Sequence, residues 1–370
     1  MLQFCERFRA HDIFRFVRLG TCIALEIAIA AGAVSGVAIG VGRMADLAGD
    51  YVAPPAEAAS HPTPTPLERS HLQVTYIEPK TIFGVPDSEL LDRLGDGTVT
   101  KLKLNRGGTS LSIRLDFSNG TRAAFKPEQT FPQSDPRREI AAYRIDRLLG
   151  INHVAPAKPI AIPYQQLIDA AEPSHRTYVA ERFADAIVRN GVVYGEVQWW
   201  LPEIKLAAFG RHRIDEHEGK DLWHEYLKVG GQIPPEYRAL CEQLSALIVF
   251  DVLIDNADRW SGANTMMSPD ASTLFFMDNT LSFSIHRFGH EIPNTALRRI
   301  EVFPRGLIAR LRDLTYEAIE RALDMGDDKR LGPLLSADAM RAILARRDNI
   351  LVHVDRLIAQ HGEDAVLTFP

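Results

Sequence analysis

Cysteine is scarce in this sequence, and its absence from most of the chain excludes two common ways of stabilising a fold. The cysteines are Cys5, Cys22 and Cys241, so only one lies beyond the first fifty residues. No intramolecular disulfide can form in the rest of the chain, and no C-x-x-C pair is present to bind zinc. The fold must therefore be stabilised by its own hydrophobic core.

An excess of positive charge is also lacking. The chain has 42 Lys and Arg against 48 Asp and Glu, a net charge of -6, and no basic run interleaved with aromatic residues. We therefore predict no nucleic-acid partner. Of the 370 residues, 46% are hydrophobic, which is enough to bury one large or two smaller globular units.

One long hydrophobic run is present, at residues 21–42, and Glu26 is its only charged residue. A helix rising about 1.5 Å per residue over this run just spans a hydrocarbon layer of roughly 30 Å. Arginines are concentrated in the preceding basic segment, residues 1–20. The positive-inside rule thus predicts a single-pass signal anchor with a cytoplasmic N-terminus and an extracytoplasmic domain, which is periplasmic, extracellular or luminal. A cleaved signal peptide and a buried soluble helix are the alternatives.

A Pro-rich linker at residues 43–70 leads into a strand-rich region, residues 71–197. The sequence LKLNRGGTSLSIRLDFSNGTRAAFKP alternates apolar and polar residues, which predicts antiparallel strands with a two-residue turn at Asn119-Gly120. A helix is predicted from Asp135, as its N-cap, to Gly150. The segments TYVAERF and GVVYGEVQWWLPEI are both predicted to be strands.

Helical patterns dominate residues 198–370. Leu240, Leu244, Leu247 and Phe250 keep helical spacing up to Ile254, and further helices are predicted from about Gly306 and Ser336. Strands first and helices later indicate an α+β fold with two lobes.

Carboxylates and amides are crowded between two apolar runs in DVLIDNADRWSGANTMMSPDASTLFFMDNTLSF, residues 251–283. We interpret this stretch as the end of a helix, a polar loop, and a hairpin of NTMM and LFFM joined by SPDAST. The hairpin brings its two ends together, so Asp258, Asn264 and Asp278 converge. Two carboxylates and an amide suit a divalent cation with phosphate, and one carboxylate can accept a proton from a hydroxyl nucleophile. Taken singly, each residue is better explained by a local cap or turn, and only their joint order favours the site.

Six short motifs in this order resemble the secretory-pathway kinase family of the Golgi casein kinase and four-jointed, a divergent protein-kinase-like group. They are RGGTSLSI, FKPE, REIAAYRIDRLLG, GEVQWWLPE, FDVLIDNADRW and FMDNTLSF, and they cover roughly residues 100 to 285. The resemblance implies a two-lobed kinase-like fold with a β-rich N-lobe and a helical C-lobe. The disulfides of animal members are missing, which indicates a bacterial or otherwise simplified relative.

The resemblance also implies roles for individual residues. Asp258 would be the catalytic aspartate, and Asp278 would be a metal ligand that bridges the nucleotide phosphates. Asn264 lies six positions after Asp258, one more than in protein kinases generally, and would complete the metal site with Glu139. The residues implied to bind ATP are Gly107, Gly108, Thr109, Lys126 and Glu139.

The predicted function is a membrane-anchored kinase, dependent on ATP and on Mn²⁺ or Mg²⁺, that phosphorylates a hydroxyl on a protein (Ser/Thr) or a glycan. One alternative is a catalytically silent kinase-like module that binds a partner at the cell envelope. Another is a cytosolic toxin-type or lipid-type kinase, which applies if residues 21–42 do not span a membrane.

Overall fold

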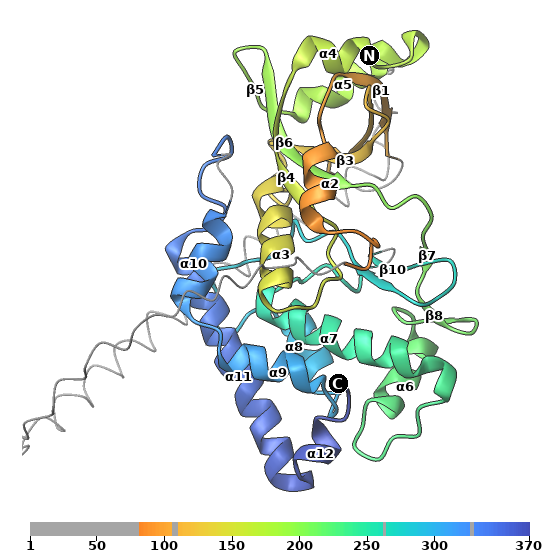
Figure 1. The fold of residues 1–370 in the computed structure, drawn as a ribbon, viewed down its shortest axis with the longest axis vertical. Helices are drawn as coiled ribbons and strands as arrows, with labels where there is room; N and C mark the ends of the chain where they lie inside the picture. The colour runs from red at the N-terminus through yellow and green to blue at the C-terminus, as the bar shows by residue number, and fades with distance from the viewer. Residues whose placement is uncertain (1–80, 106–109, 262–263, 326–328) are drawn as a thin grey trace, which may run out of the picture. The chain divides into compact units, whose positions relative to one another are not determined.

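The computed structural model describes residues 81–105, 110–261, 264–325 and 329–370 (Figure 1). All of them lie within one compact unit, Thr75–Pro370. The predicted anchor at residues 21–42 and the linker at residues 43–70 lie outside the described residues. Within the described ranges, no helix combines the length and the apolar character needed to cross a membrane.

An antiparallel sheet forms the first half of the unit, with strand order β1-β2-β3-β6-β4 and β5 paired to β6. Its strands are β1 (Val99–Leu104), β2 (Ile113–Phe117), β3 (Arg122–Pro127), β4 (Ala157–Pro163), β5 (Val188–Arg189) and β6 (Val192–Trp199). On β2, Ile113, Leu115 and Phe117 are buried and alternate with partly exposed residues, which is the period of a strand with one covered face.

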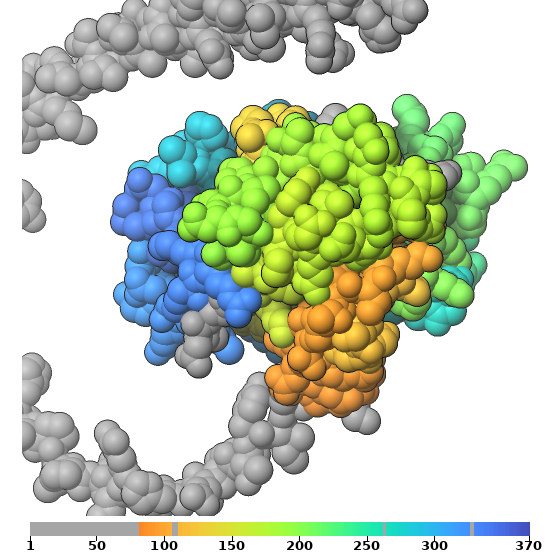
Figure 2. All heavy atoms as spheres, turned by 90° about the horizontal axis from the view of Figure 1, so that it is seen from above, coloured from red at the N-terminus to blue at the C-terminus, as the bar shows by residue number. Residues whose placement is uncertain are grey.

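Three helices accompany the sheet: α2 (Asp87–Arg93), α4 (Tyr164–Asp169) and α5 (Arg176–Arg182). Leu167 of α4 and Val179 of α5 belong to the same buried cluster as Leu115 and Phe125 of the sheet. The space-filling view from above shows the yellow-green segment that contains α4 and α5 beside the orange segment that contains β1 (Figure 2). The two helices therefore cover the apolar face of the sheet.

The segment TYVAERF is helical, and its prediction as a strand was wrong. It lies in α5, where Val179 and the following Phe183 are both buried in the sheet cluster. These two residues are four positions apart, so one helical face presents both to the core. That spacing outweighs the β propensity of the tyrosine and valine.

The hairpin between β2 and β3 was predicted in the right place but with a loop that was too short. Phe117 N donates to Thr121 O and Gly120 N donates to Phe117 O, so Ser118, Asn119 and Gly120 form a three-residue loop. Gly120 has a φ of +82°, the left-handed conformation that such loops require at their last residue. The side chain of Asn119 is engaged locally, because its amide donates to Arg93 O and its oxygen accepts from Thr121 N.

The helix predicted from Asp135 to Gly150 is confirmed as α3 (Pro136–Leu148). Asp135 caps it by accepting a hydrogen bond from Arg137 N, and Pro136 occupies its first position. Ile140 and Ile145 of α3 belong to the core of the helical part rather than to the sheet cluster. The helix thus connects the two halves of the unit.

The second half is mainly helical, built around the buried helix α7 (Arg238–Ile254). The other helices are α6 (His217–Tyr226), α8 (Glu291–Leu297), α9 (Arg305–Arg312), α10 (Tyr316–Asp324), α11 (Ala337–His361) and α12 (Glu363–Val366). Short strands complete it: β7 (Lys205–Leu206), β8 (Ala208–Phe209), β9 (His212–Arg213), β10 (Thr265–Met267) and β11 (Leu274–Phe276). The predicted α+β fold, with a strand-rich part and a helical part, is confirmed.

Candidate active site

Lys126 lies near the end of β3, and its ammonium group is held between two carboxylates. Nζ donates to Oε1 of Glu139 at 2.6 Å and to Oδ1 of Asp278 at 2.8 Å. Burial alone would lower the pKa of Lys126, but the attraction of Asp278 and Glu139 outweighs it and raises the pKa above its ordinary value. The lysine is therefore a permanent positive charge at this position.

Glu139 reaches the site from the first turn of α3, and its side chain is fully buried. Besides Lys126, it accepts hydrogen bonds from the backbone N–H of Asn279 at 3.0 Å and from the Asn279 side chain at 3.2 Å. A buried carboxylate needs such partners. Glu139 thereby joins α3 to the segment that follows β11.

Asp278 stands two residues after β11, in a left-handed backbone conformation with a φ of +54°. The Lys126 charge lowers the pKa of this carboxyl to about 2, and a hydrogen bond from the Thr280 hydroxyl adds to the effect. Its side chain is 43% exposed, against 11% for Lys126. Asp278 is thus an ionised carboxylate that remains accessible to a ligand.

The hairpin predicted to bring the polar loop and Asp278 together is confirmed. Strands β10 and β11 pair with Thr265 opposite Phe276 and Met267 opposite Leu274. The side chain of Asn256 connects the two ends, since it donates to Asp278 O at 3.2 Å and accepts from Asp258 N at 3.1 Å. Asn264 Nδ2 donates to Asp258 Oδ2 at 3.2 Å. The three predicted residues therefore lie in one hydrogen-bonded network.

Arg259 fixes the loop that carries Asp258. Its side chain is fully buried, and its Nε is 3.0 Å from Oδ2 of Asp251 on α7. The same guanidinium donates to the backbone oxygens of Asn264 and Met277 and to Oδ1 of Asn279. Burial raises the pKa of Asp251 to about 6, although Arg259 opposes the shift. One side chain thus ties together the helix, the loop and the segment that bears Asp278.

Glu196 is a further buried carboxyl in this region that sequence reasoning missed. It lies on β6 directly opposite Lys126 on β3, and it is fully buried. Neither of its oxygens has a hydrogen-bond partner among the described residues. Burial, together with the nearby Glu139 charge, raises the pKa of Glu196 well above its ordinary value. The signal in the sequence was a single charged residue, a glutamate, inside the predicted strand GEVQWW.

The predicted nucleotide-binding residues Gly107, Gly108 and Thr109 lie outside the described residues.

Asp255, at the end of α7, is buried and accepts hydrogen bonds from the His290 backbone N–H at 2.6 Å and from the His290 ring at 2.9 Å. Asp255 is therefore occupied in holding residue 290 and is not directed at the Lys126 site.

The fold is that of known kinase structures. A structure of the Golgi casein kinase with Mn/ADP bound has a TM-score of 0.58 and 18% identity, covering 76% of this chain and 78% of that one. A structure of hydra Fam20 with sugar also has a TM-score of 0.58, with 19% identity over 75% of this chain and 91% of that one. At these identities the likeness establishes the fold.

Curated relatives point to the same group. Human glycosaminoglycan xylosylkinase is 24% identical over 333 residues, which cover 79% of this chain and 81% of the relative. The human extracellular serine/threonine protein kinase FAM20C is 22% identical over 367 residues, covering 85% of this chain and 61% of the relative. A Danio rerio glycosaminoglycan xylosylkinase is 26% identical over 247 residues, covering 56% and 60%.

No family model matches the chain. The relatives and the structural neighbours together confirm the predicted resemblance to the secretory-pathway kinase family.

Proposed function

We propose that this protein is a kinase that uses ATP and a divalent metal to phosphorylate a hydroxyl group on a protein or a glycan. The observation that carries the proposal is the Lys126 ammonium held between Glu139 and Asp278, next to the loop of Asp258. The relatives named as a glycan kinase and as a serine/threonine kinase support both acceptor classes. A binding-only domain would need none of these charged residues.

The donor set fits Mn²⁺ or Mg²⁺. Glu139 and Asp278 supply hard carboxylate oxygens that already converge on one positive charge. Among the described residues, no group of three or more His, Cys, Asp or Glu side chains is arranged to hold a metal. Two carboxylates, with the Asn264 amide, would therefore leave room for phosphate oxygens, as is usual for Mg²⁺ with nucleotides. When bound, such a cation neutralises phosphate charge.

The chain's own residues would divide the remaining work. Lys126 binds a phosphate oxygen. Asp258 orients the acceptor hydroxyl and accepts its proton as the oxygen attacks the γ-phosphorus and the bond to ADP breaks. Asn256 and Asn264 hold Asp258 in place through the hydrogen bonds described above. Gly107, Gly108 and Thr109 are proposed to lie over the phosphates.

Location is part of the proposal. The arginine-rich N-terminus and the apolar run at residues 21–42 favour a membrane anchor with the kinase domain outside the cytoplasm.

The test is phosphate transfer from radiolabelled ATP with Mn²⁺ by the purified full chain, using a serine-containing peptide and a xylosyl oligosaccharide as acceptors. Asp258→Asn should lower turnover by ~10² or more and leave nucleotide affinity nearly unchanged. The matched control is Asp270→Asn, at an exposed aspartate in the turn of the same hairpin, which should retain activity because the asparagine oxygen can still accept the hydrogen bonds from Ser272. Equal turnover in wild type and Asp258→Asn would remove Asp258 from the chemistry.

A further inference from the structure

Glu196 of β6 is a buried carboxyl group to which the surrounding fold offers no partner. Its side chain is fully buried, and neither Oε1 nor Oε2 forms a hydrogen bond with any described residue. A buried polar group left in this way costs stability, so its presence calls for an explanation. A role in catalysis is one recognised reason for such a group to persist.

The strand register places Glu196 beside Lys126. The two residues are directly opposite each other in the β3–β6 pair, so their side chains leave the sheet on the same face, with Cβ atoms roughly 5 Å apart. Their neighbours Phe125 and Val197 belong to the buried cluster on the other face. Burial and then the charge of Glu139 raise the pKa of Glu196, whereas the charge of Lys126 opposes the rise. Glu196 therefore lies close to the Lys126–Glu139 pair.

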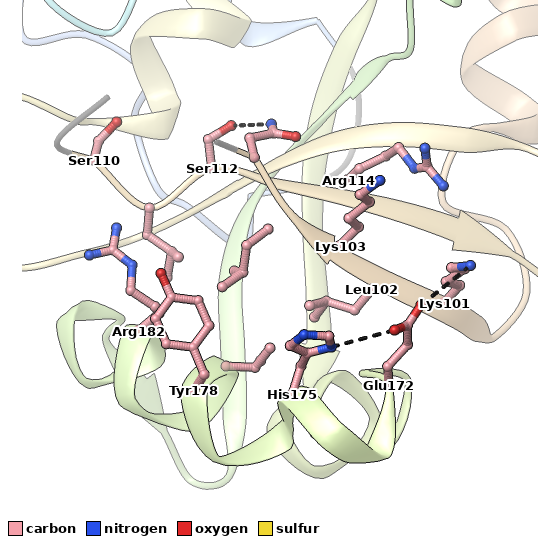
Figure 3. A pocket seen from close by; sticks show the side chains of 14 residues that line it. Lys101, Leu102, Lys103, Ser110, Ser112, Arg114, Glu172, His175, Tyr178 and Arg182 are labelled. Carbon is pink, nitrogen blue, oxygen red and sulfur yellow. Dashed lines mark hydrogen bonds and ion pairs between the residues drawn. The ribbon is translucent and has the colours of Figure 1, made fainter. Parts of the chain in front are cut away.

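The groove between β1 and α5 cannot supply the missing partner (Figure 3). Leu102 of β1 lines it together with Tyr178 and Arg182 of α5, and neither Glu196 nor Lys126 is among its lining residues. Leu102 also belongs to the buried cluster on the face of the sheet that is turned away from Glu196. A ligand in that groove would not reach the Glu196 oxygens, so their partner has to come from the side of Lys126.

Lys126 carries a hydrogen-bond donor beyond the two that it uses among the described residues. Its ammonium group has three N–H donors, and two of them serve Oε1 of Glu139 and Oδ1 of Asp278, the proposed metal ligands. Asn279 also donates to Glu139. Thr280 also donates to Asp278. Both carboxylates can therefore turn toward a cation, whereas the lysine, whose side chain is 11% exposed, then needs new acceptors.

We propose that Glu196 is a positioning residue that holds Lys126 when metal and nucleotide are bound. The lysine Nζ then donates to a carboxyl oxygen of Glu196 and to a phosphate oxygen, while Glu139 and Asp278 direct their oxygens at the cation. Only hydrogen bonds change in this step. The inference rests on the proposed function, because without a metal–nucleotide complex Lys126 has no reason to leave its present partners. Its consequence is that the charge of Lys126 is directed at phosphate and away from the two carboxylates.

Calorimetry of the full chain with Mn²⁺ and the non-hydrolysable ATP analogue AMP-PNP tests this role without any demand on phosphate transfer. Glu196→Met, which is similar in size and removes both acceptors, should weaken binding by roughly tenfold or more. Glu196→Gln should stay within about threefold of the wild type, because its amide oxygen still accepts a hydrogen bond. In excess chelator the variants and the wild type should bind equally, since Lys126 then keeps its carboxylate partners. Glu320→Met, at an exposed glutamate of α10, is the matched control and should bind as the wild type does.

Two further measurements separate positioning of Lys126 from packing. Urea unfolding of Glu196→Met at neutral pH should show at least wild-type stability, because an apolar side chain replaces a buried unpaired carboxyl group. A crystal structure of the wild type with Mn²⁺ and AMP-PNP should place Nζ of Lys126 within hydrogen-bonding distance of Glu196. If Glu196→Met fails to fold, the structure of the wild-type complex decides alone.

Three results would overturn the inference and leave the proposed function standing. They are a Lys126 that still donates to both carboxylates in the complex, equal affinity of Glu196→Met and the wild type, and equal losses in Glu196→Met and Glu196→Gln. Absence of any Mn²⁺-dependent nucleotide binding by the wild type would instead overturn the proposed function, and the inference with it.

Discussion

Lys126 neutralises part of the charge of Glu139 and Asp278 when no nucleotide is bound. Two carboxylates at hydrogen-bonding distance from one ammonium group would otherwise repel each other in a partly buried site. A metal–nucleotide complex adds positive and negative charge together, so it can enter without leaving either carboxylate unpaired. Binding of nucleotide and metal should therefore be coupled.

Asp278 provides the residue-scale test of that coupling. In the wild type, nucleotide affinity should rise when Mn²⁺ or Mg²⁺ is added, because a hard cation bridges protein and phosphate oxygens. Asp278→Ala should reduce the metal-dependent gain by roughly tenfold or more, and Asp270→Ala should not. Calorimetry with and without chelator measures both. Tight nucleotide binding in chelator, unaffected by Asp278→Ala, would exclude this role.

Glu196 should make stability depend on pH. Its pKa is raised in the folded state, mainly by burial, so it ionises at lower pH in the unfolded chain than in the folded one. As pH rises above the unfolded pKa, the unfolded state loses the proton first and stability falls until the folded pKa is passed. Glu196→Gln removes this pH-dependent loss of stability. At neutral pH the variant should therefore unfold at a higher urea concentration than the wild type.

The same measurement near pH 4 should show little difference, since the carboxyl is then protonated in both states. Glu203→Gln, at an exposed glutamate, is the control and should show no pH-dependent difference. A constant offset between Glu196→Gln and wild type at every pH would contradict the raised pKa.

The site residues differ in how well the sequence alone could predict that they lie together. Asp258, Asn264 and Asp278 belong to one continuous stretch, and a hairpin pattern was sufficient to predict that they meet. Lys126 and Glu139 were placed only through the family resemblance, because no local pattern joins a strand to a distant loop. Glu196 was missed because its position depends on the pairing of β3 with β6, which no period in the sequence specifies.

At the scale of elements, Gly195 sets the distance between β3 and β6. A Cβ at this position would lie 2.4 Å from Lys126 O and 2.8 Å from Pro127 Cα. Those neighbours are backbone atoms, so they cannot rotate away. The glycine allows the close pairing that positions Lys126 and Glu196 opposite each other.

Gly195→Ala should therefore destabilise the protein by about 1–3 kcal/mol and weaken nucleotide binding, as expected for overpacking beside a paired strand. Gly306→Ala on α9 is the control, because a Cβ there would meet the flexible end of Arg310 at 3.3 Å and, at the ordinary contact distance of 3.9 Å, the backbone oxygen of Pro370. Urea unfolding gives both values. Equal stability of Gly195→Ala and wild type would show that the strands separate easily.

Short elements were the least predictable. The sequence of α5 could be a strand or a helix, and only burial of Val179 and Phe183 on one face decides between them. Longer helices with clear N-caps were predicted correctly. Asp135 caps α3, and Ser336 caps α11, where the serine side chain accepts a hydrogen bond from Ala339 N. Caps and long periodic patterns are local, whereas the packing of a seven-residue helix is not.

At the scale of the whole molecule, the orientation of the chain in a membrane is a prediction from charge. Full-length protein should stay in the membrane fraction after high-salt and carbonate washing, and a variant lacking residues 1–43 should not. Protease added to intact cells or spheroplasts should digest the domain that follows residue 70, because the arginines of residues 1–20 keep the N-terminus inside. A domain that is protected, or released by washing, would favour the cytosolic kinase.

The distribution of the site along the chain also determines when it can assemble. Asp258, Asn264 and Asp278 lie near one another in sequence, and Arg259 can join them as soon as α7 and the hairpin exist. Lys126 and Asp278 are separated by 152 positions, so their contact closes a long loop and carries a larger entropic cost. A chain emerging from the ribosome would thus expose the strand-rich half with Lys126 and Glu139 first, and it would have no competent site until the later half with Asp258 and Asp278 has folded and docked onto it.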